Sequence, residues 1–233
     1  MRKLAVLEPL YGKSFSCPVC RNNFTSQKVR SRFVKIKGYD TDFLPFYDSD
    51  ENNPIFYYIQ VCPQCGFSFS EEFSPYFPPG SKEQIDEKIT SQWKPRDFGR
   101  KRSRNEAIQT YKLAVYSALL KKEKHVSIAG LYMRIAWLYR NAGEKTQEQR
   151  FMKLAAHEYV ESYSSGDYQG TQISETRLFY LIAELSRKTG SDEQAVKFFS
   201  KVLEQQSRSL EPGIIDMARE RWHEMRETRR QTC

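Results

Sequence analysis

Hydrophobic and polar residues alternate differently in the two parts of the chain. Before about residue 80, apolar residues come in short runs rich in β-branched and aromatic types, such as Ile55–Val61 and the alternating Phe67 and Phe69, which are typical of strands. Beyond that point, apolar residues recur three and four positions apart, the spacing of amphipathic helices. The pattern therefore predicts an α+β fold, with a small N-terminal β domain followed by an all-α helical domain.

Two breaks in the pattern divide the chain into three segments. Pro79-Gly80-Ser81 ends the β part, and Ser81-x-x-Gln84 predicts a capping box that opens a helix. A basic segment at 94–104 contains the helix breakers Pro and Gly, and six of its eleven residues are Lys or Arg. We expect a β domain over 1–80, a helix and basic hinge over 81–104, and a helical domain over 105–233.

The helical part shows spacing that is typical of tetratricopeptide repeats, in which small and bulky residues alternate along paired helices. A turn at Gly190 places Phe179, Ile182 and Ala183 on a first helix. The second helix of that pair then carries Ala195, Phe199 and Val202. A turn at Gly143 gives a second, weaker match, and Pro212-Gly213 opens a final helix that would close the array. A general helical bundle is the alternative.

In such repeats the first helix of each pair lines a concave groove. Arginines beside aromatic rings in that groove favour a carboxylate or an acidic peptide segment of a partner protein. An ordinary solvated helix surface is the alternative. The positions predicted to face the groove are Met133, Trp137, Arg140, Asn141, Arg177, Tyr180, Glu184, Arg187 and Lys188.

Four cysteines in two matched pairs carry the most specific chemistry of the chain. They are Cys17-Pro18-Val19-Cys20 and Cys62-Pro63-Gln64-Cys65. Each pair lets one tight turn present two sulfurs, so that two turns complete a closed tetrahedral site for one structural Zn²⁺. Thiol oxidoreductases also use such pairs, but in a βαβ context that the pattern does not show. The layout predicts a zinc ribbon with Cys17, Cys20, Cys62 and Cys65 as ligands.

The residue after each pair differs. Gly66 follows Cys65 and accepts a left-handed backbone at no steric cost. Arg21 holds the same place in the first pair, where a left-handed conformation would cost about 1 kcal/mol.

The formal net charge of +8 resides mainly in residues 81–233. A nucleic-acid-binding regulator is therefore an alternative to a protein that binds a partner segment in the groove. It would use a basic strand face at Lys28, Arg30 and Arg32 and a second contact at Arg100, Lys101 and Arg102. The competing interpretation is a solvent-exposed face and a charged linker. The acidic segment 38–54 lacks the Gly and the Glu of a calcium-binding EF-hand and is expected to be a surface loop.

The order of these motifs resembles a known family. Cys-Pro-Val-Cys at 17–20, then Tyr57-Tyr58 leading into Cys62-Pro63-Gln64-Cys65-Gly66, then 107–114 (Ala-Ile-Gln-Thr-Tyr-Lys-Leu-Ala) is similar to uncharacterised bacterial proteins grouped as domain-of-unknown-function family 2225. The resemblance covers most of residues 10–210. It implies a zinc ribbon followed by tetratricopeptide-like helices, and no established activity. Arg21 is a departure from the usual ribbon glycine.

The sequence contains no recognisable catalytic motif. The three histidines, His125, His157 and His223, have no cysteine or carboxylate at ligand or triad spacing. A hydrolase whose catalytic residues form no such motif is the third alternative. The apolar run at the N-terminus stops at Glu8-Pro9, too short for a signal peptide, and no stretch has the length of a membrane helix. We expect a cytoplasmic, non-enzymatic adaptor that binds a protein and neither a membrane nor a small-molecule substrate, with Cys233 as a flexible free thiol.

Overall fold

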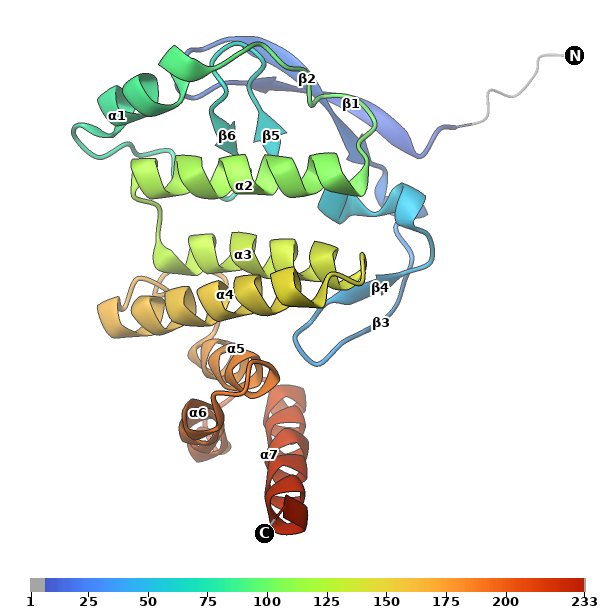
Figure 1. The fold of residues 1–233 in the computed structure, drawn as a ribbon, viewed down its shortest axis with the longest axis vertical. Coiled ribbons are helices and arrows are strands. Elements are labelled where there is room, and N and C mark those ends of the chain that lie inside the picture. Colours follow the sequence, from blue (N-terminus) through green and yellow to red (C-terminus); the bar gives the residue numbers. More distant parts are fainter. Residues whose placement is uncertain (1–6, 233) are drawn as a thin grey trace, which may run out of the picture. The chain divides into compact units, whose positions relative to one another are not determined.

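The computed structural model describes residues 7–232 (Figure 1). Within these, the chain forms two compact units. Unit 1 contains the described residues up to Tyr39 together with Pro45–Glu123, and unit 2 contains Asp40–Leu44 together with the residues from Lys124 onward. The start of the region considered for a signal peptide, residues 1–6, and the terminal Cys233 lie outside the described residues.

Three two-stranded antiparallel sheets form the β part of unit 1. Strand β1 (Leu10–Ser16) pairs with β2 (Asn23–Val29), and Ser16 lies opposite Asn23, so the first cysteine pair is the turn of this hairpin. Strand β5 (Gln60–Val61) pairs with β6 (Ser68–Phe69) around the second cysteine pair. Between them, β3 (Ile36–Tyr39) pairs with β4 (Pro45–Tyr47). Together with the helices below, these sheets confirm the predicted α+β class.

The strand predicted over Ile55–Val61 is wrong in its first half. A 3₁₀ helix spans Pro54–Tyr57, and only the last two residues pair as β5. The reason is local: the Asn53 side chain accepts a hydrogen bond from the N–H of Ile55, and Pro54, which has no N–H, occupies the first turn. Short 3₁₀ helices also span Ser31–Phe33, Asp50–Asn52 and Thr90–Gln92.

Two helices complete unit 1, α1 (Ser81–Lys88) and α2 (Arg104–Lys121). The capping box predicted at Ser81 is wrong, because Gly80 is the cap residue and the Ser81 hydroxyl donates to the Pro78 carbonyl. The capping box lies instead at Ser103 and Glu106, where each side chain pairs with the backbone of the other at the start of α2.

The observed division of the chain differs from the three predicted segments. Helix α2 belongs to unit 1, and the last passage between the units falls at Glu123–Lys124 and not in the expected hinge at 94–104. That segment is anchored by Arg102, which is only 5% exposed. Its guanidinium donates to the carbonyls of Phe56 and Ile59 at 3.0 and 2.8 Å and to that of Phe98 at 2.7 Å.

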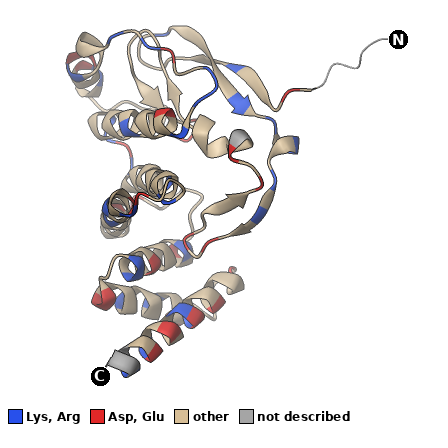
Figure 2. Ribbon diagram, turned by 45° about the vertical axis from the view of Figure 1, so that its right-hand side comes forward, with Lys and Arg blue, Asp and Glu red and all other residues tan. Residues whose placement is uncertain are grey.

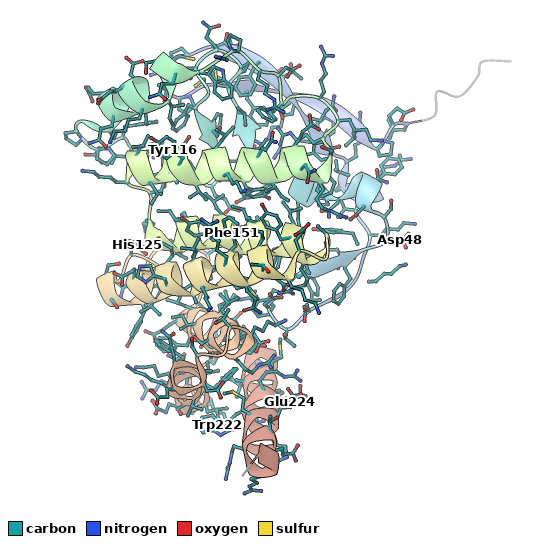
Figure 3. All side chains as sticks on the ribbon, in the orientation of Figure 1. Asp48, Tyr116, His125, Phe151, Trp222 and Glu224 are labelled. Atoms are coloured by element: carbon teal, nitrogen blue, oxygen red, sulfur yellow. The ribbon has the colours of Figure 1, made fainter. Side chains whose placement is uncertain are left out.

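Unit 2 contains five helices among the described residues. They are α3 (His125–Arg140), α4 (Lys145–Ser165), α5 (Glu175–Lys188), α6 (Asp192–Glu204) and α7 (Pro212–Thr232). Gly143 lies in the turn from α3 to α4 and Gly190 in the turn from α5 to α6, each with a positive φ of 74° and 79°. Figure 3 labels His125 at the start of α3 and Phe151 on α4. The helix pairs and their glycine turns agree with the sequence pattern, whereas the tetratricopeptide assignment stays a prediction.

The last helix is amphipathic as expected. Ile214, Ala218 and Met225 are buried on one side of α7, and Trp222 is half-buried. Acidic and basic residues are interspersed along the rest of the helix (Figure 2).

Candidate metal centre and helical groove

The two cysteine pairs form turns with the same backbone hydrogen bonds. In the first, the Cys17 N–H donates to the Asn22 carbonyl at 2.9 Å and the Arg21 N–H to the Cys17 carbonyl at 3.0 Å. In the second, Cys62 donates to Phe67 at 3.0 Å and Gly66 to Cys62 at 2.9 Å. Arg21 and Gly66 both adopt positive φ, 65° and 75°. Arg21 therefore adopts the left-handed conformation whose steric cost was considered from the sequence.

The two turns bring all four sulfurs together. The Sγ atoms of Cys17, Cys20, Cys62 and Cys65 lie within 4.8 Å of one another. The Cys17–Cys65 and Cys20–Cys62 separations are each 3.6 Å. A disulfide would need about 2.0 Å, whereas a tetrahedron with metal–sulfur bonds of about 2.3 Å has edges of about 3.8 Å. Two opposite edges of the sulfur cluster therefore match those of a tetrahedral metal site, and no sulfur pair is farther apart than 4.8 Å.

The thiols also influence one another's ionisation. A hydrogen bond to Cys62, together with burial, raises the pKa of Cys17 to about 12. The bonds that Cys62 accepts from Cys17 and Cys65 lower the pKa of Cys62, and N–H groups of Gln64 and Cys65 act in the same direction. The pKa of Cys65 is raised by its sulfur neighbours. Because four clustered thiolates repel one another, a bound cation is what would keep the whole set deprotonated.

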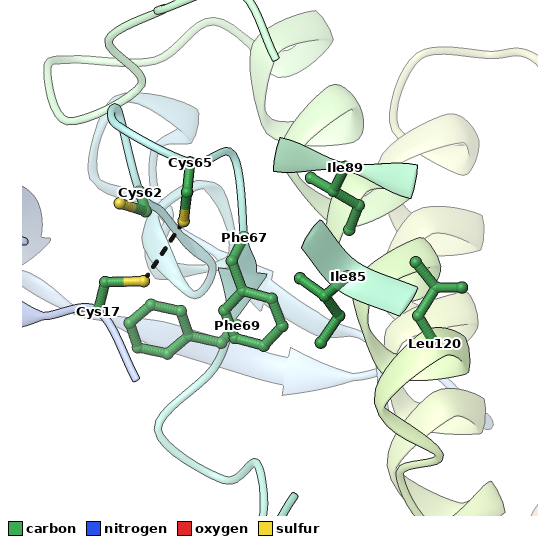
Figure 4. Close-up of a cluster of buried hydrophobic side chains, with 8 residues drawn as sticks. All are labelled: Cys17, Cys62, Cys65, Phe67, Phe69, Ile85, Ile89 and Leu120. Carbon is green, nitrogen blue, oxygen red and sulfur yellow. Dashed lines mark hydrogen bonds between the residues drawn. The ribbon is translucent and has the colours of Figure 1, made fainter. Parts of the chain in front are cut away.

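Apolar side chains surround the cluster on its buried side. Cys17, Cys62 and Cys65 are at most 1% exposed, while Cys20 is exposed. Figure 4 shows the sulfurs beside Phe69 and Phe67, with side chains of α1 and α2 beyond. The members of this core drawn there are Cys17, Cys62, Cys65, Phe67, Phe69, Ile85, Ile89 and Leu120. The cysteines are thus part of the hydrophobic core of unit 1.

Sequence reasoning missed one residue of the centre, Trp93. Its indole N–H donates to the Pro63 carbonyl at 2.9 Å. Its ring lies against Gly66, where an added Cβ would stand 2.4 Å from ring carbons. Since Trp93 comes from beyond α1, no local spacing links it to the second cysteine pair.

All four corners of the tetrahedron are protein ligands. Soft thiolates in this geometry suit Zn²⁺ or an iron centre. The cluster can therefore hold one metal ion.

In unit 2, the predicted groove residues surround a segment of the chain itself. This segment, Asp40–Leu44 (Asp-Thr-Asp-Phe-Leu), is called here the acidic loop. It lies against side chains of α3 and α5 that form what is called here the loop site: Arg140, Arg177, Tyr180, Glu184 and Lys188. The expectation of a solvated surface loop over 38–54 is therefore wrong at these five residues, where Asp42 is fully buried and Leu44 is 1% exposed.

Arg140 makes the densest contacts with the acidic loop. Its guanidinium binds both carboxylate oxygens of Asp42, at 3.0 and 2.6 Å, and also reaches Asp40 and Glu148, each at 2.5 Å. Burial alone would lower the pKa of Arg140, but the hydrogen bonds and charges of Asp42 and Glu148 outweigh it and raise that pKa. This is the two-pronged pairing of an arginine with a carboxylate.

The rest of the loop is held by α5. Tyr180 donates its hydroxyl to the Thr41 carbonyl at 2.8 Å, and Lys188 lies 3.2 Å from Asp40. The Phe43 ring packs against that of Tyr180, with centroids 5.5 Å apart, and the Arg177 guanidinium lies 4.8 Å above Phe43.

Four predicted groove residues do not bind the loop directly. Met133 is buried in the core. Arg187 pairs with Glu184 at 2.8 Å, and Glu184 in turn accepts from the Thr41 hydroxyl. The described residues show no hydrogen bond or ring contact between the loop and Trp137 or Asn141. Trp137 Nε1 is buried without a hydrogen-bond partner in the described part of the chain, and Asn141 is exposed at the end of α3.

The basic residues considered for nucleic acid do not form the expected strand face. Lys28 is in β2 and pairs with Glu71 at 2.6 Å, whereas Arg30 lies beyond the strand, over the Tyr11 ring. Arg32 is in a 3₁₀ helix, because the extended pairing stops at Val29. In the other predicted contact, Arg100 and Lys101 are exposed but Arg102 is buried and used by the fold.

Within residues 7–232, no helix combines the length and the apolar character needed to cross a bilayer. No curated protein and no solved structure matches the chain. A family model described as "Uncharacterized protein conserved in bacteria (DUF2225)" matches residues 10–225. That span includes both cysteine pairs and all but the end of the last helix, in the order that suggested the resemblance. The chain therefore belongs to the uncharacterised bacterial family DUF2225.

Proposed function

We propose that the chain is a cytoplasmic, non-enzymatic adaptor. Its four-cysteine centre holds one structural Zn²⁺, and its helical unit binds an acidic segment of a partner protein. The observation that carries the proposal is the set of four sulfurs within 4.8 Å of one another, which supports binding of one metal ion by four thiolates.

Zinc is the metal we favour for two reasons. The donor set is four thiolates in two turns, which is the arrangement of structural zinc sites. Three of the four sulfurs are buried in the core of unit 1, so the metal would join two hairpins where the small sheets alone bury little surface.

Elemental analysis of purified, reduced protein tests the metal. We expect one zinc per chain in the wild type and in Cys233→Ser, which removes the cysteine outside the two pairs. Cys20→Ser should lose most of the zinc, because Cys20 is the exposed fourth ligand. Zinc absent from wild type, or retained equally in Cys20→Ser, would contradict the proposal.

The partner-binding role rests on the basic and aromatic side chains of the loop site and on Arg187, whose guanidinium pairs with Glu184 of that site at 2.8 Å. Co-purification from native cells should lose the specific partner when Arg177→Glu and Arg187→Glu are combined. The matched control is Arg150→Glu plus Lys153→Glu, which makes the same change of charge at exposed positions of α4. Circular dichroism establishes that both variants are folded. Equal partner recovery from the two folded variants would count against the loop site as the binding surface.

A further inference from the structure

The acidic loop is attached to the helices of unit 2 as a bound peptide would be. Its backbone is paired within itself, since the Asp40 N–H donates to the Leu44 carbonyl and the Phe43 N–H to the Asp40 carbonyl, both at 2.9 Å. Each hydrogen bond described above between the loop and α3 or α5 uses a helix side chain. The loop therefore satisfies its own turn and presents carboxylates, a carbonyl and a ring to the helices.

The loop also comes from far away in the chain. It is separated by about 100 residues from Arg140 and by almost 150 from Lys188. Both of its ends continue into unit 1, at Tyr39 and at Pro45. Side-chain contacts, and not proximity in sequence, therefore hold the acidic loop against the helices of unit 2.

The site is chemically selective. The Arg140 guanidinium grips Asp42 with two parallel bonds, and Lys188 adds a second cation at Asp40. Tyr180 and Arg177 contact the ring of Phe43. The site therefore selects two acids one residue apart, followed directly by an aromatic residue.

The loop adopts this shape at a cost. Phe43 has a φ of 65°, in the left-handed region that a bulky residue rarely occupies. Such a conformation costs on the order of 1–2 kcal/mol and persists only where its surroundings hold it. A separate peptide is not obliged to turn back into β4 and can avoid this cost.

We propose that the loop site is a receptor for an Asp-x-Asp-aromatic segment of a partner protein, and that residues 40–44 are its intramolecular ligand, which that segment displaces. The inference rests on the proposed adaptor function and names the chemistry of the partner. A tethered ligand acts at an effective concentration of about millimolar. In the free protein the acidic loop therefore occupies the loop site. A segment of a partner protein binds tightly only when the acidic loop dissociates from that site.

The test uses full-length protein and a fluorescein-labelled peptide with the sequence of residues 38–46, followed by fluorescence anisotropy. We expect Asp40→Asn plus Asp42→Asn, which weakens the tethered ligand, to bind this peptide at least tenfold more tightly than wild type. The matched control, Asp48→Asn plus Asp86→Asn, removes two exposed acids outside the loop and should bind as wild type does.

Two further arms make the test specific. A peptide with Asn at both acidic positions should not bind, and adding Lys188→Met to the loop variant should weaken binding of the acidic peptide at least tenfold. The proposal is overturned if the folded loop variant fails to bind the acidic peptide, or if the Asn peptide binds equally well.

Wild-type protein gives an independent measurement if the loop variant does not fold. Saturating acidic peptide should accelerate hydrogen exchange of the Asp40 and Phe43 amides, which are bonded within the loop. Unchanged exchange at saturation overturns displacement.

The outcomes separate this inference from the proposed function. If peptide binding depends on Lys188 but native partners still bind after charge reversal at Arg177 and Arg187, the loop site is a receptor for the peptide. The adaptor role proposed for that site is then wrong. If charge reversal abolishes partner binding but the loop variant binds no peptide, the adaptor function stands. The proposed Asp-x-Asp-aromatic ligand is then wrong.

Discussion

At the scale of single residues, the positions after the two cysteine pairs adopt one conformation with different side chains. Arg21 is exposed and bears the steric cost of a left-handed backbone, about 1 kcal/mol. Gly66 avoids that cost and also leaves room for the Trp93 ring. The second turn therefore favours glycine for two reasons, its left-handed backbone conformation and the Trp93 ring packed against it.

Gly66→Ala should destabilise unit 1 by more than about 2 kcal/mol, because the added Cβ both strains the backbone and meets the Trp93 ring. Denaturant unfolding of the metal-loaded protein measures the change. Gly80→Ala is the matched control, since Gly80 has a φ of 78° and no atom within 4 Å of an added Cβ. It should lose only about 1 kcal/mol. Equal losses would mean that the Trp93 contact adds nothing.

Arg102 carries a second prediction at this scale. Arg102→Met should cost about 3 kcal/mol or more, because the carbonyls of Phe56, Ile59 and Phe98 would lose a buried donor. Arg100→Met, at a side chain that is 88% exposed, should change stability by less than about 0.5 kcal/mol. Urea unfolding midpoints compare the two, and similar values would contradict the structural role of Arg102.

The sequence identified the metal ligands but not the role of Arg102. Cysteine spacing is a local property, so both turns could be predicted from residues three apart. A basic segment looks alike whether its side chains are solvated or folded inward. Arg102 differs because its guanidinium donates to backbone carbonyls in and just after the 3₁₀ helix Pro54–Tyr57. That helix was itself predicted as a strand.

At the scale of elements, the acidic loop ties the stability of the helical unit to pH. Burial disfavours the charged form of Asp40, but the Thr41 N–H and the charges of Lys188 and Arg140 outweigh it and hold the pKa of Asp40 below its ordinary value of 3.8. Glu211 is shifted in the same direction, since its bonds to Ser174 and Arg177 outweigh burial. In both cases the folded state favours the ionised carboxylate.

The stability that ionised Asp40 contributes should therefore be complete above about pH 4 and lost as the pH falls through its lower folded-state pKa. Asp40→Asn should remove about 1 kcal/mol at pH 7 and flatten the stability curve below pH 4. Thermal unfolding of the helical unit between pH 7 and 3 measures this. Asp216→Asn, at an exposed side chain of α7, should keep the wild-type curve. If the stability of Asp40→Asn falls with pH as steeply as that of the wild type, this role of the Asp40 carboxylate is contradicted.

Helix ends show which element-level features the sequence could predict. The turns at Gly143 and Gly190 were predicted, because a left-handed residue between two periodic stretches is a strong signal. Two motifs of similar appearance at Ser81 and Ser103 behave differently, because Ser81 is already the first residue of α1, whereas Ser103 precedes α2 as its cap and accepts from the Glu106 N–H. The position of each serine relative to the start of its helix decides between them.

At the scale of the whole molecule, the metal should matter to the units unequally. Its ligands form part of the core of unit 1, and the ligands of a structural metal release binding free energy only when folded together. Unit 2 contains no member of the cluster.

Removal of the metal with a strong chelator should therefore abolish hydrogen-exchange protection in β1, β2, β5 and β6. Protection in α4, α5 and α6 should remain. Exchange measured by mass spectrometry separates these segments, and a mock-treated sample with zinc restored is the control. Simultaneous loss of protection in both units would contradict this assignment of the metal.

The division into units was the part that the sequence could not supply. The predicted boundaries followed changes of composition at residues 80 and 104, whereas α2 shares its core with the cysteines through Leu120. The five residues of the acidic loop were placed with their sequence neighbours. Nothing local shows that their carboxylates are matched by an arginine about 100 residues later and a lysine almost 150 residues later.

Because the backbone passes between the units at three places, no single cut can separate them intact. A fragment beginning at Lys124 would carry every helix of the second unit but leave the Arg140 guanidinium with neither aspartate. A faithful dissection would have to graft Asp-Thr-Asp-Phe-Leu back by a linker. If the fragment without this pentapeptide folds poorly, the cause would be the loss of the pentapeptide and not an intrinsic instability of the helices.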